Sequence, residues 1–452
     1  MEPILRLIET PFVLLSRLRR ARRPADGDPA RQRGIAVDLD TGGPWDPPAS
    51  DLARHAYLLG ATGSGKTTAI LALLGLDLRA GHSVAVVDLR GDLVAGTLSL
   101  CERLGVGPER VSLLDLREKS RVRGFDPLSG AGEPYVRALH ALDAVSAEAE
   151  SWGVQLEETM RSAFLLLAHA RRPLTDLERL LSDRRFREDC LGTVEDEALA
   201  RFWQRYGAMS DERQAAWTTP VLNKVTPLLA VPVLRRVLSG EEGICLGAVL
   251  AEPGSVLLVS LAVDELHRSA RMLGSLLVSS VSREMMARVD VPERERNPVR
   301  LYVDEFENMA SEAFEGLIAE GRRFGLTLVL SHQTLAQLPQ RLRSVVRNNV
   351  GIQVVFGLGF EDAQALAREL PEDVSAADLR ALPPGGAYLL ARDGEVRRLR
   401  FHRPEKPRPA AKARAYRDIV LPGSPPARRE DGGEEEGAPS VRADEGFPED
   451  LL

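Results

Sequence analysis

Residues 55–68 read HAYLLGATGSGKTT, a short apolar run followed by a glycine-rich turn that fits the pattern G-x-x-x-x-G-K-[ST]. A helical pattern continues from Lys66 to about Leu78, so the turn lies between an expected strand and an expected helix. Glycines let successive backbone N–H groups curl around phosphate oxygens, and the helix N-terminus adds its positive dipole end. The pattern therefore predicts a phosphate-binding loop. The residues expected to contact a nucleotide are Gly60, Ala61, Thr62, Gly63, Ser64, Gly65, Lys66, Thr67 and Thr68.

Two side chains of this loop have distinct expected roles. Lys66 should reach the β- and γ-phosphates, and the Thr67 hydroxyl should ligate Mg²⁺. Only five of the 59 Lys and Arg residues are Lys, so a lysine in a glycine-rich turn is rarely there by chance. We expect ATP as the nucleotide and Mg²⁺ as its metal.

A second element, residues 299–305 (VRLYVDE), is an apolar strand that ends in two adjacent acids. It is typical of a Walker B element, in which Asp304 would hold the Mg²⁺ shell and Glu305 would polarise the attacking water. Taken alone, Asp-Glu after apolar residues is also a common helix start. The phosphate-binding loop favours the first interpretation.

Two further segments supply polar side chains. Residues 327–333 (TLVLSHQ) read as a neighbouring strand whose last residue, Gln333, is the candidate γ-phosphate sensor, with His332 as a structural neighbour. Between the two strands, Arg322 or Arg323 could stabilise transition-state charge in the site of a neighbouring subunit. The alternative for both arginines is a solvated helix end.

The remaining apolar runs predict an α/β fold with a mostly parallel sheet. Asp393-Gly394 is a good hairpin turn, so the last strands should close the sheet in antiparallel fashion. Residues 133–250 show helical periodicity and almost no strand signal, which predicts an all-helical insertion into an ATPase domain formed by 34–132 and 251–403. The expected strands lie near 34–39, 55–59, 83–87, 111–114, 256–261, 299–303, 327–330, 352–356, 388–390 and 396–401.

The two ends of the chain have a different composition from the body. Residues 1–33 begin with an apolar segment followed by five arginines, which indicates an amphipathic helix on an anionic membrane or on a partner, or a short packed helix and a linker. A cleaved signal peptide is not expected, because the basic cluster follows the apolar stretch. Residues 404–452 are rich in Pro and Arg and then in acids, and we expect a disordered tail.

Charge, cysteine content and hydropathy exclude several classes of protein. The net charge of −7 belongs to residues 429–452, and the rest of the chain sums to zero, so there is no global electrostatic argument for nucleic acid. The three cysteines lie far apart with no ligand spacing, which argues for a reducing cytosol and against structural zinc. No apolar run reaches the roughly 18 residues that span a bilayer, so no integral membrane span is predicted.

Taken together and in order, several segments resemble the HerA/FtsK superfamily of ring ATPases, and most closely the coupling proteins of type IV secretion and conjugation (the TraG/TraD type). The match runs over roughly residues 50–400. The segments that carry it are GATGSGKTT at 60–68, VVDLRGD at 86–92, GFDPL at 124–128, SWGVQLEETMRSAFLLL at 151–167, PVLNKVTPLL at 220–229, LYVDEFEN at 301–308, EGRRFGL at 320–326, SHQ at 331–333 and VRNNVG at 346–351.

This resemblance implies a RecA-like P-loop core of the additional-strand type with an inserted all-α domain. It also implies a homo-hexamer that threads DNA through a channel with ATP, with Arg322 as the trans-acting arginine and Gln333 as the sensor. A secretion-channel or relaxase-like protein would be the partner. Two departures stand out: many relatives begin with transmembrane helices, and Asp126 stands where they often have Asn.

The sequence thus favours an ATP-hydrolysing DNA translocase, located in the cytoplasm or peripherally at the inner face of the membrane. Two alternatives stay open. The same motor could drive a coupling module that recruits protein substrates, or the protein could be a slow nucleotide-gated switch. Arg341, Arg343 and Arg347 either face a channel or form a solvated helix face.

Overall fold

The computed structural model describes residues 34–149, 151–241, 243–309, 312–370, 374–392, 394–403 and 410–421. The expected N-terminal helix and the acidic end of the expected tail lie outside these residues. None of the described helices combines the length and the apolarity needed to span a bilayer.

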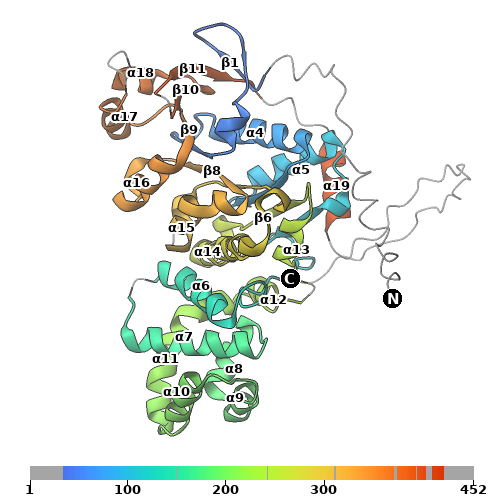
Figure 1. Ribbon diagram of the computed structural model, residues 1–452, viewed down its shortest axis with the longest axis vertical. Coiled ribbons are helices and arrows are strands. Elements are labelled where there is room, and N and C mark those ends of the chain that lie inside the picture. Colours follow the sequence, from blue (N-terminus) through green and yellow to red (C-terminus); the bar gives the residue numbers. More distant parts are fainter. Residues whose placement is uncertain are drawn as a thin grey trace, which may run out of the picture.

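A single eleven-stranded sheet organises the described chain (Figure 1). Its order is β2-β1-β11-β10-β9-β3-β8-β7-β4-β6-β5. From β9 to β5 every neighbouring pair is parallel, whereas β10, β11, β1 and β2 extend the sheet with antiparallel pairs. The mostly parallel sheet and the closing β10–β11 hairpin predicted from the sequence are confirmed. The strands are β1 (Ala36–Asp38), β2 (Pro44–Trp45), β3 (His55–Leu59), β4 (Ser83–Asp88), β5 (Val111–Asp115), β6 (Val256–Ser260), β7 (Val299–Val303), β8 (Leu326–His332), β9 (Val350–Val355), β10 (Gly386–Ala391) and β11 (Val396–Phe401).

The central strands form because their residues are apolar without alternation. All residues of β3, β4 and β6 are buried, as expected for parallel strands that carry helices on both faces. One face packs against α4 (Lys66–Ala80) and α5 (Asp92–Leu104), and the other against α14 (Val263–Met286), α15 (Glu312–Glu320) and α16 (Gln340–Asn349). The phosphate-binding loop and the Walker B acids therefore both follow parallel strands and lie at the carboxyl edge of the sheet.

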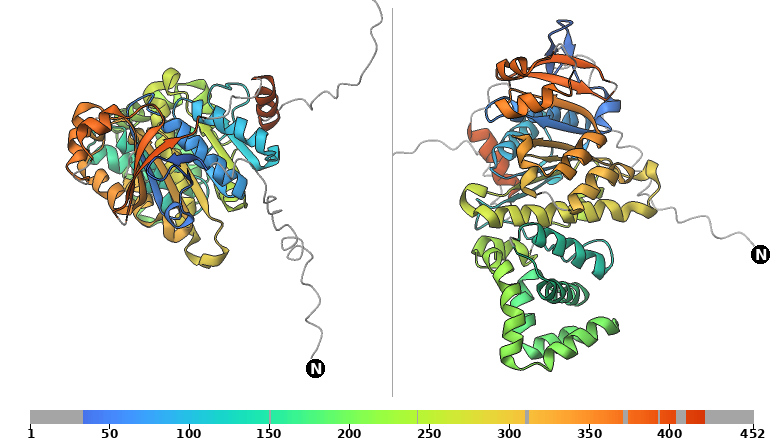
Figure 2. Two further views of the ribbon diagram at one scale, coloured as in Figure 1. Left: turned by 90° about the horizontal axis from the view of Figure 1, so that it is seen from above. Right: turned by 90° about the vertical axis from the view of Figure 1, so that its left-hand side faces the viewer.

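Between β5 and β6 the described chain forms helices and no strand, and the right-hand view of Figure 2 shows most of these helices below the long α14. They are α6 (Pro134–Ala147), α7 (Val154–His169), α8 (Leu177–Ser182), α9 (Arg184–Leu191), α10 (Glu197–Gly207), α11 (Asp211–Leu229), α12 (Pro232–Leu238) and α13 (Leu246–Ala251). Helix α6 packs on α14, and α13 packs on α14 and β6. The helices from α6 to α13, called the helical segment below, thus attach to the sheet through α14.

The loop at 124–132 joins the sheet to these helices and is held at several points. Phe125 N–H donates to Val237 O (2.7 Å), so the chain entering the helical segment is bonded to the chain leaving it. From α14, Arg283 donates to Pro127 O (2.9 Å) and Glu284 accepts from Ala131 N–H (2.7 Å). Burial raises the pKa of Asp126 to about 6, and this carboxylate caps the turn by accepting from Leu128 N–H (3.0 Å).

The expectation of a disordered tail from residue 404 is wrong for its middle part. Residues Ala410–Val420 form helix α19, which packs against α5 on the outer face of the sheet. Tyr416 is buried and its hydroxyl donates to Val106 O (2.8 Å), while Arg417 pairs with Asp115 and Glu118. Composition misjudged this segment because one aromatic and a few ion pairs anchor an otherwise polar helix.

We predict that Tyr416→Ala lowers the free energy of unfolding by about 3 kcal/mol, because it removes a buried aromatic ring and its hydrogen bond. Ile419→Ala on the same helix is the matched control. Ile419 is 54% exposed, so its truncation should change stability by less than about 0.5 kcal/mol. Urea unfolding of both variants measures the difference, and equal effects would mean that α19 does not pack as described.

Candidate nucleotide-binding site

The glycine-rich loop after β3 has the backbone of a phosphate cradle. Gly63 and Gly65 have positive φ angles (76° and 117°), which non-glycine residues rarely adopt. A Cβ at Gly65 would also lie 2.8 Å from Gly385 N, so the loop is pressed against the start of β10. Helix α4 begins at Lys66 with no side-chain cap and no acid in its first turn, which leaves its first N–H groups for an anion.

Two side chains of the loop fit a phosphate ligand. The Lys66 amine is buried and donates to Gly60 O (2.5 Å) and Ala61 O (3.2 Å), and burial lowers its pKa. The Ser64 hydroxyl is buried and has no hydrogen-bond partner among the described residues. An unpaired buried hydroxyl beside a curled backbone fits an anion-binding site. Thr67 is exposed and Thr68 half-buried on the first turn of α4.

The Walker B acids lie at the end of β7 in a polar cluster. Asp304 accepts a hydrogen bond from Ser331 at the end of β8. Burial raises the pKa of Asp304, and the nearby Asp88 and Glu305 carboxylates act in the same direction. Glu305 has φ 51°, a conformation that non-glycine residues seldom adopt and that is common at functional sites.

Gln333 joins the two motifs. Its amide Nε2 donates to Glu305 Oε1 (2.5 Å), and its Oε1 accepts from the Thr62 hydroxyl of the loop (3.0 Å). The structure therefore brings the loop, the Walker B acids and the candidate sensor into one cluster. His332, the residue before Gln333, is buried. Its ring stacks on that of Tyr57 with the centroids 5.3 Å apart, and its Nδ1 is hydrogen-bonded to the Tyr57 hydroxyl at 3.0 Å. Burial lowers the pKa of His332 to about 3, so it is a neutral packing residue.

Arg322 and Arg323 lie at the other edge of the sheet. They belong to a 3₁₀ turn, η6 (Gly321–Phe324), that directly precedes β8, and β8 runs parallel to β3. The length of β8, at about 3.3 Å per residue, separates this turn from the chain's own loop by roughly 20 Å. The Arg322 side chain is exposed and makes no hydrogen bond or ion pair within the described part of the chain. At that distance Arg322 does not reach the chain's own phosphate-binding loop.

Three residues of the cluster were missed by sequence reasoning. Arg90, in the loop after β4, forms an ion pair with Glu305 (3.2 Å). Ser331 orients Asp304, and Glu307 adds a third carboxylate. Arg90 and Glu307 follow the buried strands β4 and β7, and Ser331 lies near the end of β8. Their position at strand ends was the available signal.

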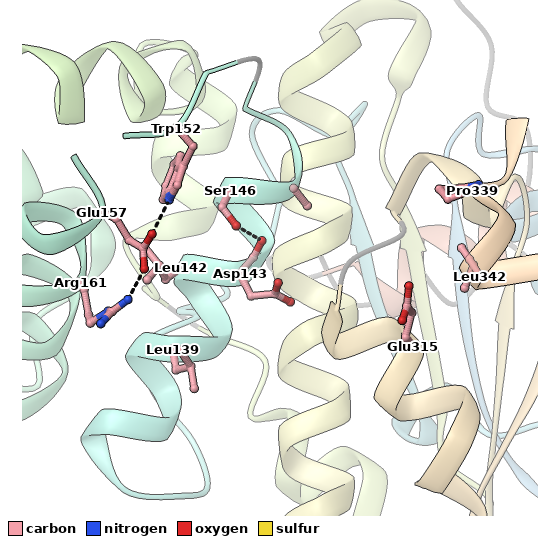
Figure 3. Close-up of a pocket in the computed structure, with 11 residues that line it drawn as sticks. Leu139, Leu142, Asp143, Ser146, Trp152, Glu157, Arg161, Glu315, Pro339 and Leu342 are labelled. Carbon is pink, nitrogen blue, oxygen red and sulfur yellow. Dashed lines mark hydrogen bonds and ion pairs between the residues drawn. The ribbon is translucent and has the colours of Figure 1, made fainter. Parts of the chain in front are cut away.

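A separate pocket of about 480 Å³ lies where α6 and α7 face α15 and the start of α16 (Figure 3). Glu157 is held there between the Trp152 indole (3.2 Å) and Arg161. Across the pocket lie Glu315 and Leu342 of the sheet domain. None of the residues predicted from the sequence as nucleotide ligands or catalysts lines it. Among the described residues no group of three or more His, Cys, Asp or Glu could hold a metal ion.

Comparison with solved structures identifies the fold. The bacterial conjugative coupling protein TrwBdeltaN70 in an unbound form matches with a TM-score of 0.61 at 19% identity, over 84% of this chain and 92% of that chain. The chain has the fold of a conjugative coupling protein. The same protein in complex with ADP and Mg²⁺ matches with a TM-score of 0.62 at 19% identity, again over 84% and 92% of the two chains. VirB4 of Thermoanaerobacter pseudethanolicus matches with 0.54 at 13% identity, over 82% and 96%.

These matches confirm the RecA-like P-loop fold and the resemblance to type IV secretion coupling proteins predicted from the motifs. Comparisons of the sequence itself add nothing further: no model of a known protein family matches it, and no curated protein does. The likeness therefore rests on the arrangement of the chain in space.

Glu307 gives a test of the site's electrostatics. Burial raises its pKa from 4.5 to about 7, and the Glu305 and Asp304 carboxylates add to this shift. Its Oε2 is buried without a hydrogen-bond partner among the described residues. The folded protein therefore holds a proton on Glu307 over a pH range in which the unfolded chain has lost it.

We predict that this proton stabilises the wild type fully below about pH 4.5 and that the benefit is lost as the pH rises through about 7. Relative to Glu307→Gln, the free energy of unfolding of the wild type should fall by about 3 kcal/mol across this range. Urea unfolding of both proteins at several pH values measures it. An identical pH dependence in the two proteins would contradict the assignment.

Proposed function

We propose that the protein is an ATP-hydrolysing ring motor that translocates DNA, in the manner of a coupling protein of type IV secretion or conjugation. The observation that carries the proposal is the cluster in which Gln333 links Thr62 of the phosphate-binding loop to Glu305 of the Walker B strand. Gln333 can sense a γ-phosphate only if it lies between these two elements.

In the proposed reaction each residue has a separate task. Lys66 leaves its loop carbonyls for the β- and γ-phosphates of ATP, and the N–H groups from Gly60 to Thr68 hold the phosphate oxygens. Glu305 accepts a proton from water, whose oxygen attacks the γ-phosphorus as ADP departs. Mg²⁺, held by Thr67, Asp304 and phosphate oxygens, would neutralise charge on the phosphates. The Asp304 and Glu305 carboxylates have the chemistry for metal binding and proton acceptance. Ser331 donates a hydrogen bond to Asp304 and orients it.

The ring and the cargo rest on further support. The exposed, unpaired Arg322 at the far edge of the sheet is useful in catalysis only to a second copy, which favours a homo-hexamer with Arg322 as the trans-acting arginine. DNA as cargo is supported by the solved relatives, which are named as conjugative and plasmid coupling proteins.

We further propose that residues 133–250 form the all-α domain beside a motor of 34–132 and 251–403. A secretion-channel or relaxase-like partner, and a place in the cytoplasm or at the inner membrane face, belong to the same proposal.

We predict that Lys66→Ala loses at least about 100-fold in ATP turnover, because the buried amine and its phosphate contacts are removed. Glu305→Gln should bind ATP as the wild type does and yet lose turnover to a similar extent, because an amide accepts no proton. Steady-state phosphate release and titration with a fluorescent ATP analogue measure the two properties. Turnover by Glu305→Gln at the wild-type rate would reject Glu305 as the base.

We predict that Arg322→Ala loses turnover and that activity returns in part when it is mixed with Glu305→Gln. In mixed rings an intact arginine of one subunit can then serve an intact Glu305 of the next. Arg323→Ala is the matched control, since Arg323 lies beside it in η6 and packs against Phe324. Loss without recovery on mixing would make Arg322 a structural residue, and the same pattern in Arg323→Ala instead would transfer the role to Arg323.

A further inference from the structure

The Arg90–Glu305 ion pair has no place in the proposed reaction. It occupies the side chain that must accept a proton from water. Resting on the proposed function, we propose that Arg90 is a positioning residue that restrains Glu305, and that the phosphate backbone of nucleic acid at the carboxyl edge of the sheet draws Arg90 away and so stimulates ATP hydrolysis.

The strand order gives the ion pair a direction. Glu305 follows β7, whose two neighbours in the sheet are β8 and β4. Gln333 follows β8, on the side of the phosphate-binding loop, and Arg90 follows β4, on the side away from it. Both contact the same oxygen, Glu305 Oε1: Gln333 donates a hydrogen bond to it at 2.5 Å, and Arg90 forms an ion pair with it at 3.2 Å. Arg90 therefore holds the carboxylate from the side opposite to the nucleotide.

The backbone beneath Arg90 is fixed, so the guanidinium has a defined reach. Asp88 is buried and accepts hydrogen bonds from the N–H groups of Arg90 (2.9 Å), Leu93 (2.7 Å) and Val94 (3.0 Å). The turn contains Gly91 at φ 96°, where a Cβ would lie 2.8 Å from the Ser260 hydroxyl. A rigid turn at this point keeps the side chain within reach of Glu305.

The side chain of Arg90 remains open to a ligand. It is 58% exposed, whereas that of Glu305 is 17% exposed. An ion pair with one partner so exposed is weak and readily exchanged. A phosphate offers the guanidinium a bidentate, charge-assisted partner, so a nucleic-acid backbone can compete for it.

The neighbouring cations are already engaged, which singles out Arg90. Arg117 donates to Arg90 O (3.0 Å) and pairs with Asp264 (2.6 Å) and Glu265 (3.2 Å) in the first turn of α14. Lys119 also pairs with Glu265 (3.2 Å). Through Arg117, these contacts tie the turn that holds Arg90 to α14, and α14 is the helix on which α6 packs.

The experiment measures steady-state ATP turnover of the full chain as single-stranded or duplex DNA is added. For Arg90→Ala we expect turnover without DNA to rise by about fivefold, as a restraint on the base is lost, and the stimulation by DNA to fall towards one. The KM for ATP should stay as in the wild type. Arg90→Lys keeps a charge and should retain part of the restraint.

Arg184→Ala is the matched control. Arg184 is an exposed arginine with an ion-pair partner, Glu188 at 2.7 Å, but it lies in the helical segment. Its turnover and its stimulation by DNA should equal those of the wild type. Arg90→Met keeps the aliphatic stem and replaces Arg90→Ala if the latter melts at a lower temperature than the wild type.

The outcomes separate this inference from the proposed function. If the wild type shows no turnover that Lys66→Ala removes, the proposed function fails and this inference with it. If the wild type hydrolyses ATP but Arg90→Ala loses turnover, or raises the KM for ATP, then Arg90 acts on the nucleotide and the restraint is rejected. Unchanged stimulation of Arg90→Ala by DNA rejects it as well.

Discussion

The site depends on the balance of charge around the Lys66 amine. Burial disfavours its charged form and lowers its pKa, and the carboxylates of Asp304, Glu305 and Glu307 offset part of this effect. In turn, burial raises the pKa of Asp304 and Glu307. These groups lie close together because β3, β8 and β7 are parallel neighbours and all end at the carboxyl edge of the sheet. The fold thus places buried ionisable side chains at the edge where a phosphate and a metal ion would bind.

The same constraint explains why the fold could be predicted from the sequence. Buried parallel strands need continuous apolar runs, and a phosphate-binding loop needs glycines and a lysine at fixed spacing, so both are visible locally. Gln333 and Glu305 were predicted for the same reason, since each follows such a run. Their hydrogen bond, and the one from Thr62, depend on the strand order, which only the structure supplies.

Arg90 and α19 were not predicted because their partners are distant in the sequence. Arg90 pairs with a carboxylate more than 200 residues away, and its position after a strand does not indicate that partner. In α19, the Tyr416 hydroxyl donates to Val106 O and Arg417 pairs with Asp115, and both partners come much earlier in the sequence. Composition averages over a segment and therefore cannot reveal a few long-range anchors. The placement of Arg322 away from its own loop is likewise a property of the three-dimensional arrangement.

The central claim is that ATP hydrolysis at this site moves DNA. The most direct measurement is ATP-dependent displacement of a third-strand oligonucleotide from duplex DNA, together with displacement of streptavidin from the end of a biotinylated single strand. The account predicts displacement from at least one substrate by the wild type and none by Glu305→Gln. Vigorous ATP turnover without displacement from either substrate would contradict it and would favour protein cargo.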